Sequence, residues 1–306
     1  MKLGFLTASM PERSLEDIAK WAAEHGYEAL ELAAWPTIGD RPFTAAHVAA
    51  DAFDAAEADR VRKALEDNGL ELSAFAYYDN NLDPDPAKRE AYHAHLRACI
   101  DAAAELGGVP VGTFIGRDPG RSVAENMREA EKVFPPLVEY AGERGVKLMI
   151  ENCVMEGWHP DGYPGNLAYS PELWEWMFDL GLYLNFDPSH LLWLGIDPIE
   201  ALRPYVGKVI HAHAKDAEVF PEQRNRFGSF GRVSTREEDP WDMGYWRYRI
   251  PGLGQVDFRR YVDTLYEGGF DGVLSVEHED PVWGGTPEKV NQGLELAHRH
   301  LKPLLL

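Results

Sequence analysis

Short apolar segments alternate along the chain with longer segments whose apolar residues recur every three or four positions. The first pattern is typical of a strand buried on both faces, and the second of an amphipathic helix. We predict strands at residues 3–7, 28–33, 70–76, 110–115, 146–151, 182–187, 208–213 and 272–277. We predict helices at residues 15–25, 55–68, 87–106, 122–144, 171–180, 198–205, 257–267 and 287–301. Because each helix can carry the chain back to the start of a neighbouring strand, this order predicts a parallel sheet.

The number of strand–helix pairs decides between two parallel architectures. Eight pairs within 306 residues predict a closed (β/α)8 TIM barrel rather than an open doubly wound sheet. No Gly-x-Gly-x-x-Gly motif follows the first strand, which counts against a dinucleotide-binding fold. Since there is no linker and no break in composition, we predict a single α/β domain over residues 1–306, with its active site at the C-terminal ends of the strands.

Composition and charge narrow the functional classes. The formal net charge is −21, from 51 acidic and 30 basic residues, and such a surface repels nucleic acid and anionic membranes. The two cysteines, Cys99 and Cys153, are too few for a disulfide framework. The first apolar run is too short for a signal peptide, and no later run could span a bilayer. We therefore predict a cytoplasmic enzyme or binding protein that has no nucleic-acid or membrane partner.

Four consecutive predicted strands, the fifth to the eighth, end in a carboxylate or an imidazole: Glu151, Asp187, His213 and Glu277. In a (β/α)8 barrel these ends share one rim, so the four side chains should meet there. Three carboxylates held close together repel one another, and a divalent cation is the natural compensation. A ligand set of oxygens and one imidazole suits Mn²⁺ best, while Mg²⁺, Co²⁺ or Zn²⁺ would also fit. The alternative is that each residue is a separately paired polar group at a strand end.

Motifs spread over nearly the whole chain resemble the sugar-phosphate isomerase/epimerase-like superfamily of xylose isomerase-like TIM barrels. They are Lys-Leu-Gly-Phe at 2–5, Gly-Tyr-Glu-Ala-Leu-Glu-Leu at 26–32, Ile-Glu-Asn at 150–152, Asn-Phe-Asp-Pro-Ser-His at 185–190, His-Ala-His-Ala-Lys-Asp at 211–216, Pro-Gly-Leu-Gly-Gln-Val-Asp at 251–257 and Val-Glu-His-Glu at 276–279. The superfamily includes ketose 3-epimerases, enzymes that process hydroxypyruvate and inosose, and endonuclease IV. These motifs are specific for the superfamily and its metal site, and much less specific for the substrate.

The resemblance implies roles for individual residues. Glu151, Asp187, His213 and Glu277 match the metal ligands, and His190 matches a histidine close to the substrate. Glu151 and Glu277 also match the acid–base pair of ketose epimerases. The implied activity is that of a metal-dependent sugar isomerase or epimerase, which removes a proton next to a carbonyl through a metal-stabilised enediolate.

Three alternatives stay open. A lyase or dehydratase acting on a keto-sugar, a keto-cyclitol or an oxidised glycoside, including C-glycoside cleavage, would remove the same proton and then expel a β-substituent. Ketose epimerases usually carry an arginine shortly after the ligand histidine, where this chain has Lys215-Asp216. This difference weakens the assignment of this chain as a ketose epimerase. A nuclease related to endonuclease IV would need further histidines at the ends of the third and fourth strands. Those ends read Phe-Ala-Tyr-Tyr and Thr-Phe-Ile-Gly here, which counts against this alternative. A non-catalytic sugar-binding protein would not need two facing carboxylates.

Further polar and aromatic residues near the strand ends are candidates for substrate binding. Glu31 ends the second strand and Trp158 follows the fifth, so both could meet a small-molecule carbohydrate or keto-sugar. Lys215 could bind a substrate oxygen or form an ion pair with Asp216. His211 lies two residues before His213 and therefore points to the same side of the strand, as a partner of the ligand.

A long insertion, at about residues 217–250, separates the seventh strand from its helix. Because it follows a C-terminal strand end, we predict that it covers the catalytic rim as a lid. It is rich in aromatic residues and arginines, and we expect Trp246 or Arg249 to reach the substrate. The same composition fits a subunit interface of a homo-oligomer, and the alternative is a loop that only packs on the rim.

Overall fold

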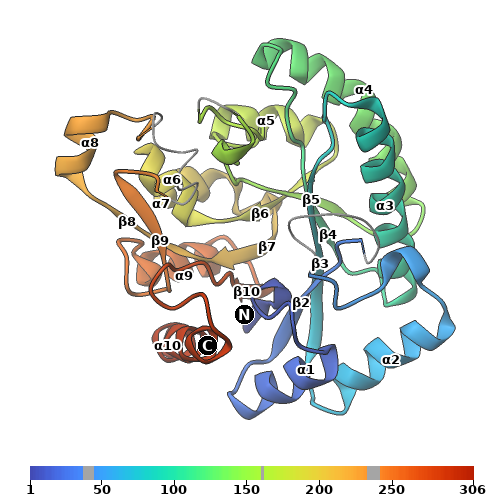
Figure 1. Cartoon of the computed structure of the whole chain (residues 1–306). Coiled ribbons are helices and arrows are strands. Elements are labelled where there is room, and N and C mark those ends of the chain that lie inside the picture. The colour runs from blue at the N-terminus through green and yellow to red at the C-terminus, as the bar shows by residue number, and fades with distance from the viewer. Residues whose placement is uncertain (37–44, 160–161, 233–241) are drawn as a thin grey trace.

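The computed structural model describes residues 1–36, 45–159, 162–232 and 242–306. Eight parallel strands close into a barrel in the order β1-β10-β7-β6-β5-β4-β3-β2, which confirms the predicted (β/α)8 fold (Figure 1). The barrel strands are β1 (Lys2–Leu6), β2 (Ala29–Ala33), β3 (Glu71–Asn80), β4 (Val111–Phe114), β5 (Leu148–Glu151), β6 (Tyr183–Phe186), β7 (Val209–Ala214) and β10 (Val273–Val276). Their residues are almost all buried, as expected for strands covered by helices on one side and packed inside the barrel on the other.

Helices follow the strands around the outside of the barrel (Figure 1). They are α1 (Leu15–Glu24), α2 (Ala55–Glu66), α3 (Pro86–Glu105), α4 (Val123–Gly142), α5 (Pro171–Asp179), α7 (Pro198–Leu202), α9 (Phe258–Glu267) and α10 (Pro287–Leu301). Local sequence explains their starts: Ser14 caps α1, and Ser122 forms a capping box with Glu125 at the start of α4. None of the helices described is long and apolar enough to cross a membrane.

Two of the described α-helices were not predicted, α6 (Pro188–Leu194) beside the site and α8 (Pro221–Phe227) within the insertion. α6 begins directly after β6, and the predicted helix at 198–205 is shortened to α7, followed by a 3₁₀ turn. Asp187 is the N-cap of α6, and its Oδ1 accepts a hydrogen bond from the Ser189 N–H at 2.8 Å. Pro188 ends the strand as predicted, but it also occupies the first helical position, where its missing N–H costs nothing. The turn therefore delivers Asp187 and His190 to the rim on a short rigid helix.

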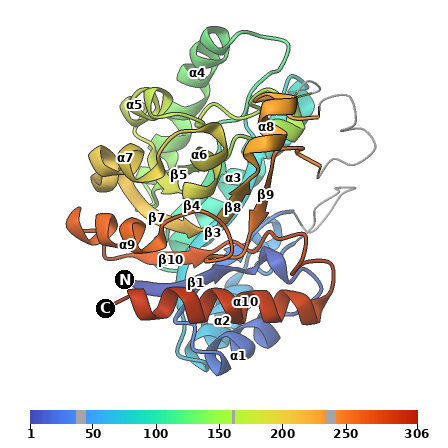
Figure 2. The same cartoon turned by 90° about the vertical axis from the view of Figure 1, so that its left-hand side faces the viewer.

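The described part of the insertion forms regular structure. β8 (Asp216–Val219) pairs with β9 (Trp246–Arg249) as an antiparallel ribbon, and α8 (Pro221–Phe227) stands between them in the chain, at the periphery of the molecule (Figures 1 and 2). The ribbon packs on α6, where the rings of Trp246 and Trp193 stack with centroids 4.5 Å apart and an interplanar angle of 3°. The ribbon is thereby fixed beside the helix that carries His190.

Asp216 anchors this ribbon to the barrel. Its buried carboxylate accepts hydrogen bonds from the backbone N–H groups of Ala217, Gly252, Gly254 and Val256 at 2.8–3.0 Å. A side chain in place of the Gly254 hydrogen would lie 2.3 Å from Asp216 Oδ1, so this close approach requires glycine. The motif Pro-Gly-Leu-Gly-Gln-Val thus wraps its N–H groups around one carboxylate.

Asp216→Ala should lower the free energy of unfolding by about 3 kcal/mol, because it leaves several buried N–H groups without an acceptor. Urea denaturation monitored by circular dichroism would measure the change. Asp179→Ala, at an exposed position on α5, is the matched control and should stay within about 0.5 kcal/mol of the wild type. Equal stability of the two variants would contradict the anchoring role of Asp216.

Candidate metal centre

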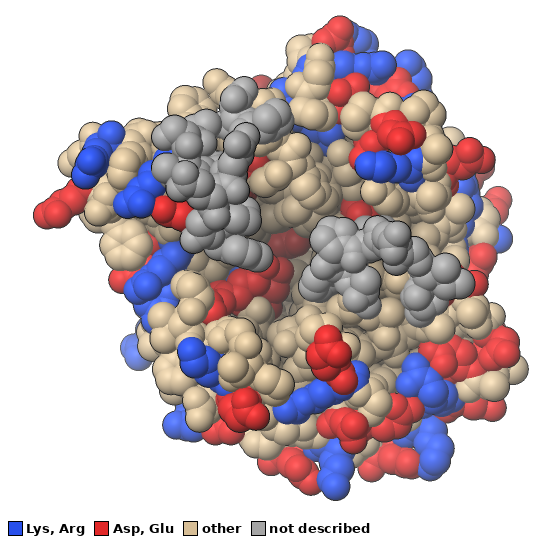
Figure 3. Space-filling model, in the orientation of Figure 1, with Lys and Arg blue, Asp and Glu red and all other residues tan. Residues whose placement is uncertain are grey.

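The four predicted ligands meet at the C-terminal rim of the barrel. Glu151 is the last residue of β5, Asp187 follows β6, His213 lies in β7 and Glu277 follows β10. These strands are neighbours in the barrel, and one ligand atom from each residue lies within 4.8 Å of the others. Asp and Glu side chains line a hollow near the middle of the face seen in Figure 3. The structure therefore brings together all four residues that were predicted as metal ligands from their positions at strand ends.

Two buried atoms of this cluster have no hydrogen-bond partner: Asp187 Oδ2 and His213 Nδ1. Asp187 directs Oδ1 to the start of α6, which leaves Oδ2 facing the cluster. His213 Nδ1 lies 3.0 Å from Glu277 Oε2 and 3.5 Å from Glu151 Oε1. Asp187 Oδ2 has ion-pair contacts at 3.2 Å with His190 and Lys215, and an unprotonated Nδ1 of His213 would face two carboxylates with no proton between them. A bound cation would give these atoms a common partner. The donor set thus fits a divalent metal ion.

Asn152 holds the backbone of Asp187 in place. Its amide donates to the Asp187 carbonyl at 2.8 Å, and its carbonyl oxygen accepts the Asp187 N–H at 2.7 Å. Asn152 is fully buried between β5 and β6. The motif Ile-Glu-Asn therefore supplies the ligand Glu151, and its next residue, Asn152, fixes the backbone of the ligand Asp187.

Lys215 brings a positive charge to the cluster. Its buried ammonium lies 2.8 Å from Glu277, 3.2 Å from Asp187 and 3.1 Å from Glu279. The predicted alternative, an ion pair with Asp216, is wrong, because Asp216 is occupied by backbone N–H groups. The reason is strand alternation: residues 211, 213 and 215 point into the barrel, whereas the next residue points the other way.

His190 connects the cluster to the inserted ribbon. Its Nε2 lies 3.3 Å from Glu151 Oε1 and 3.2 Å from Asp187 Oδ2, and its Nδ1 lies 2.9 Å from the Tyr248 hydroxyl. Lys215 Nζ lies 4.5 Å from the centre of the Tyr248 ring. The sequence did not single out Tyr248. Alternation along Trp-Arg-Tyr-Arg places Tyr248 on the same side of the strand as Trp246, but it does not show whether that side faces the site.

The environments of the two candidate acid–base carboxyl groups differ. Burial alone would raise the pKa of Glu151, but hydrogen bonds from His190 and His213 and the charge of Lys215 lower it to about 2. Burial raises the pKa of Glu277, and the nearby Glu151 carboxylate adds to this effect, although Lys215 and His213 oppose it. Two carboxyl groups with pKa values shifted apart are a recurring arrangement in acid–base catalysis.

The other predicted substrate contacts are placed as follows. Trp158 lies beyond the end of β5, with its ring edge-to-face on Phe114 at a centroid distance of 5.5 Å. Trp246 is buried against Trp193, and Arg249 pairs with Glu218 and Asp280 at 3.0 Å each. Residues 233–241 of the insertion lie outside the described residues. The roles of Trp158, Trp246 and Arg249 in substrate binding, and that of the insertion as a lid or interface, stay predictions.

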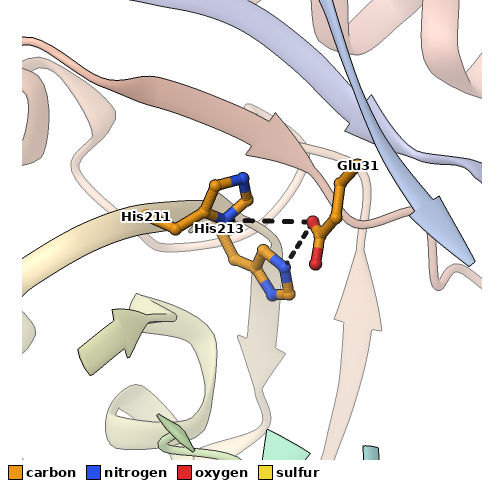
Figure 4. A group of neighbouring side chains, drawn as sticks. All are labelled: Glu31, His211 and His213. Atoms are coloured by element: carbon orange, nitrogen blue, oxygen red, sulfur yellow. Dashed lines mark hydrogen bonds and ion pairs between the residues drawn. The ribbon is translucent and has the colours of Figure 1, made fainter. Parts of the chain in front are cut away.

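Glu31 lies inside the barrel rather than at its mouth. Its fully buried carboxylate lies 2.9 Å from His213 Nε2 (Figure 4). The Glu151 and Glu277 carboxylates lie at the other ring nitrogen, Nδ1. Burial would raise the pKa of Glu31, but the charges of His213 and His211 lower it to about 2. His211 points inward as predicted, and its ring nitrogens lie 3.1 Å from Asn185 and from Ser73.

Known proteins resemble this chain along most of its length. It is 29% identical to the protein YfiH of Bacillus subtilis over 92% of this chain and 93% of that protein. It is 25% identical to an inosose dehydratase of Clostridium perfringens over 72% of this chain and 74% of that enzyme.

Solved structures share the fold. A D-psicose 3-epimerase crystallised in the presence of D-fructose superposes with a TM-score of 0.68 at 17% identity, over 98% of this chain and 99% of that chain. The IolI protein with a bound zinc atom superposes with a TM-score of 0.67 at 20% identity, over 99% and 96%. Residues 19–303 match the family described as xylose isomerase-like TIM barrel. The closed barrel and this match together show that the chain belongs to the xylose isomerase-like TIM-barrel family.

Proposed function

We propose that this protein is a divalent-metal-dependent enzyme that removes a proton from the carbon next to a carbonyl group in a small polyhydroxylated substrate. One observation carries the proposal: Glu151, Asp187, His213 and Glu277 converge at the rim, with one ligand atom of each within 4.8 Å of the others. These four residues would hold the ion. A divalent ion bound there would polarise the substrate carbonyl and make the adjacent C–H more acidic.

Glu151 and Glu277 are the proposed acid–base pair. The pKa of Glu151 is lowered and that of Glu277 is raised, which supports different roles for the two carboxyl groups in proton transfer. His190 orients Glu151 through the 3.3 Å contact between Nε2 and Oε1. Lys215 holds Glu277 from the other side and can also meet an oxygen of the substrate.

The first candidate outcome is isomerisation or epimerisation, in which one carboxyl group removes the proton and the other returns a proton at a new position or on the other face. The carboxyl groups of Glu151 and Glu277 flank His213 Nδ1 from different strands, which supports this outcome. The D-psicose 3-epimerase with the same fold provides an analogy only at the level of the fold.

The second candidate outcome is elimination, in which the β-substituent leaves after the proton has been removed. The similarity to inosose dehydratase over 72% of the chain favours it. The site also contains proton donors beyond the two carboxyl groups, since Lys215 and the His190–Tyr248 pair border the cluster. Such groups could protonate a departing hydroxyl or aglycone oxygen.

We infer a neutral carbohydrate or keto-sugar as the substrate class. The cluster is rich in carboxylates, and the cation that contacts it, Lys215, is already paired with three of them. A phosphate group or a nucleic-acid backbone would meet repulsion there, in a protein of net charge −21. A cytoplasmic location and Mn²⁺ as the resident ion stay part of the proposal.

The Tyr248 hydroxyl should matter to the reaction through His190. Tyr248→Phe removes the 2.9 Å hydrogen bond to His190 Nδ1 and should lower kcat by up to about tenfold, with metal content unchanged. Tyr163→Phe, at an exposed ring, is the control and should keep wild-type kinetics. A Tyr248→Phe enzyme with unaltered kcat would contradict the contact's role in turnover.

The decisive experiment follows substrate protons in deuterated water. Protein loaded with Mn²⁺ would be incubated with ketoses, keto-inositols and 3-keto-glycosides, the substrate would be separated, and NMR and mass spectrometry would report deuterium uptake and product formation. Deuterium with a rearranged sugar would indicate an isomerase or epimerase, and loss of water or aglycone a lyase. Ligand binding without exchange or elimination on any of these compounds would contradict the proposal and indicate a sugar-binding protein.

A further inference from the structure

His213 has two ring nitrogens in different surroundings. Nδ1 faces Glu151 and Glu277 at the rim, whereas Nε2 faces Glu31 from β2 at 2.9 Å (Figure 4). A ligand histidine binds a metal through one nitrogen, and the partner of the other nitrogen sets the tautomer and the ring orientation. The partner of Nε2 therefore bears directly on metal binding.

We propose that Glu31 is a positioning residue, which holds the proton of His213 on Nε2 and so presents Nδ1 as the metal-binding atom. The inference rests on the metal site of the proposed function and extends it to a residue that touches neither the ion nor the substrate. It also replaces the role in substrate binding that the sequence suggested for Glu31.

Glu31 is itself held from two further strands. Ser275 of β10 donates to Oε2 at 2.8 Å, and the Tyr78 hydroxyl of β3 donates to Oε1 at 2.9 Å. Each carboxylate oxygen thus has a fixed donor in a fully buried setting, which leaves the carboxylate little freedom to rotate. A buried carboxylate needs such partners, because unpaired burial of its charge would be costly. The proposed contact is therefore rigid enough to orient the imidazole.

The proton balance is simple. Carboxylates lie on both sides of the His213 ring, Glu31 at Nε2 and Glu277 at Nδ1. A metal ion at Nδ1 would require that nitrogen without a proton, so any proton there would be released to solvent, while the Nε2 proton would stay in the hydrogen bond to Glu31. Glu31 neither gains nor loses a proton, and its negative charge increases the basicity of the ligand nitrogen.

Two neighbouring groups could compete for this role. Asn185 Nδ2 lies 3.0 Å from His213 Nε2 and, as a donor, would favour an unprotonated Nε2. The same amide group has an acceptor in the Tyr78 hydroxyl at 2.8 Å, whereas the Glu31 carboxylate can only accept and therefore favours the proton on Nε2. His211 Nδ1 lies 4.0 Å from Glu31, so Glu31, His211 and His213 could be read as a second metal site. The His211 nitrogens are engaged by Asn185 and Ser73, and Glu31 by Ser275 and Tyr78, so an ion there would have to break several hydrogen bonds.

The first test measures metal affinity without any activity assay. Metal-free wild type, Glu31→Gln and Ser73→Ala would be titrated with Mn²⁺ by calorimetry, after circular dichroism has shown that each is folded. Glu31→Gln should weaken binding about 10- to 100-fold, the range known for partners of ligand histidines. Ser73→Ala is the matched control, because Ser73 contacts His211 and not His213. Its affinity should equal that of the wild type.

The second test needs no variant of Glu31. In ¹⁵N-histidine NMR of the Zn²⁺-loaded wild type, with His213 assigned from the spectrum of His213→Gln, we expect a metal-bound Nδ1 and a protonated Nε2. Binding through Nε2, or an unchanged affinity of folded Glu31→Gln, would overturn the inference while the metal site of the proposed function stands. Failure of the wild type to bind any divalent ion would overturn both.

Discussion

Replacing Glu277 or Glu151 by glutamine should reduce turnover by about 10³-fold, within the range that proton-transfer groups contribute. Glutamine keeps the shape of the side chain but can neither carry the proton nor supply a charged ligand atom. Both residues stand at the rim within 3.0–3.5 Å of His213 Nδ1, so each substitution alters the same cluster from a different strand. The loss should appear mainly in kcat, because the reacting proton is affected more than the outer contacts of the substrate.

Turnover could fall because proton transfer is lost or because the metal ion is lost, so the two effects must be measured separately. Steady-state kinetics at saturating Mn²⁺, together with metal analysis of the same samples, would show whether turnover falls while the ion stays bound. Glu288→Gln, in the exposed first turn of α10, is the matched control and should behave as the wild type. A metal-loaded Glu151→Gln or Glu277→Gln enzyme with near-wild-type kcat would remove that residue from the proposed acid–base pair.

Removal of the metal should abolish activity and leave the protein folded. Without the ion, the charge of Lys215 still compensates Asp187 and Glu277, and Glu31 and Glu277 keep the pKa of His213 above its ordinary value despite burial, which favours an imidazolium between them. The carboxylates of the cluster therefore keep positively charged neighbours after the ion is removed, and the protein should stay folded. The wild type should nevertheless lose the stability that binding confers, about 2.7 kcal/mol at an ion concentration 100 times the Kd.

Thermal unfolding and activity assays after treatment with a chelator, and again after adding back Mn²⁺, Mg²⁺, Co²⁺ or Zn²⁺ singly, would test this prediction. Recovery of activity and of Tm with the same ion would identify the ion that the site uses best. Full activity in protein shown by elemental analysis to contain far less than one metal ion per chain would contradict a metal-dependent reaction.

The barrel was predictable because its signals are local. Apolar strands of a few residues, amphipathic helices and their caps repeat along the chain, and each depends on neighbours in sequence. Once the repeat is recognised, topology places every C-terminal strand end on one rim. Glu151, Asp187, His213 and Glu277 could therefore be grouped from strand ends alone, and the structure brings their ligand atoms within 4.8 Å.

α6 was missed because its start coincides with the end of β6. Asp187-Pro188 ends a strand and begins a helix equally well, and a seven-residue helix is too short to show a full amphipathic repeat. Its consequence for the site is direct, since Asp187 caps the helix through Oδ1 and turns Oδ2 toward the other ligands.

Sequence by itself determined that Glu151, Asp187, His213 and Glu277 stand at strand ends on one rim and that His211 shares the side of His213, since strand order and alternation need no tertiary information. It did not show that Glu31 lies inside the barrel. Only the tertiary structure decided their partners. Glu31 on β2 meets His213 on β7 across the closed interior, 182 residues apart in the chain. Lys215 meets Glu277 rather than Asp216, and Tyr248 reaches His190 from the inserted ribbon. Such contacts depend on the closure of the barrel and the packing of the ribbon on α6, which no periodicity along the chain specifies.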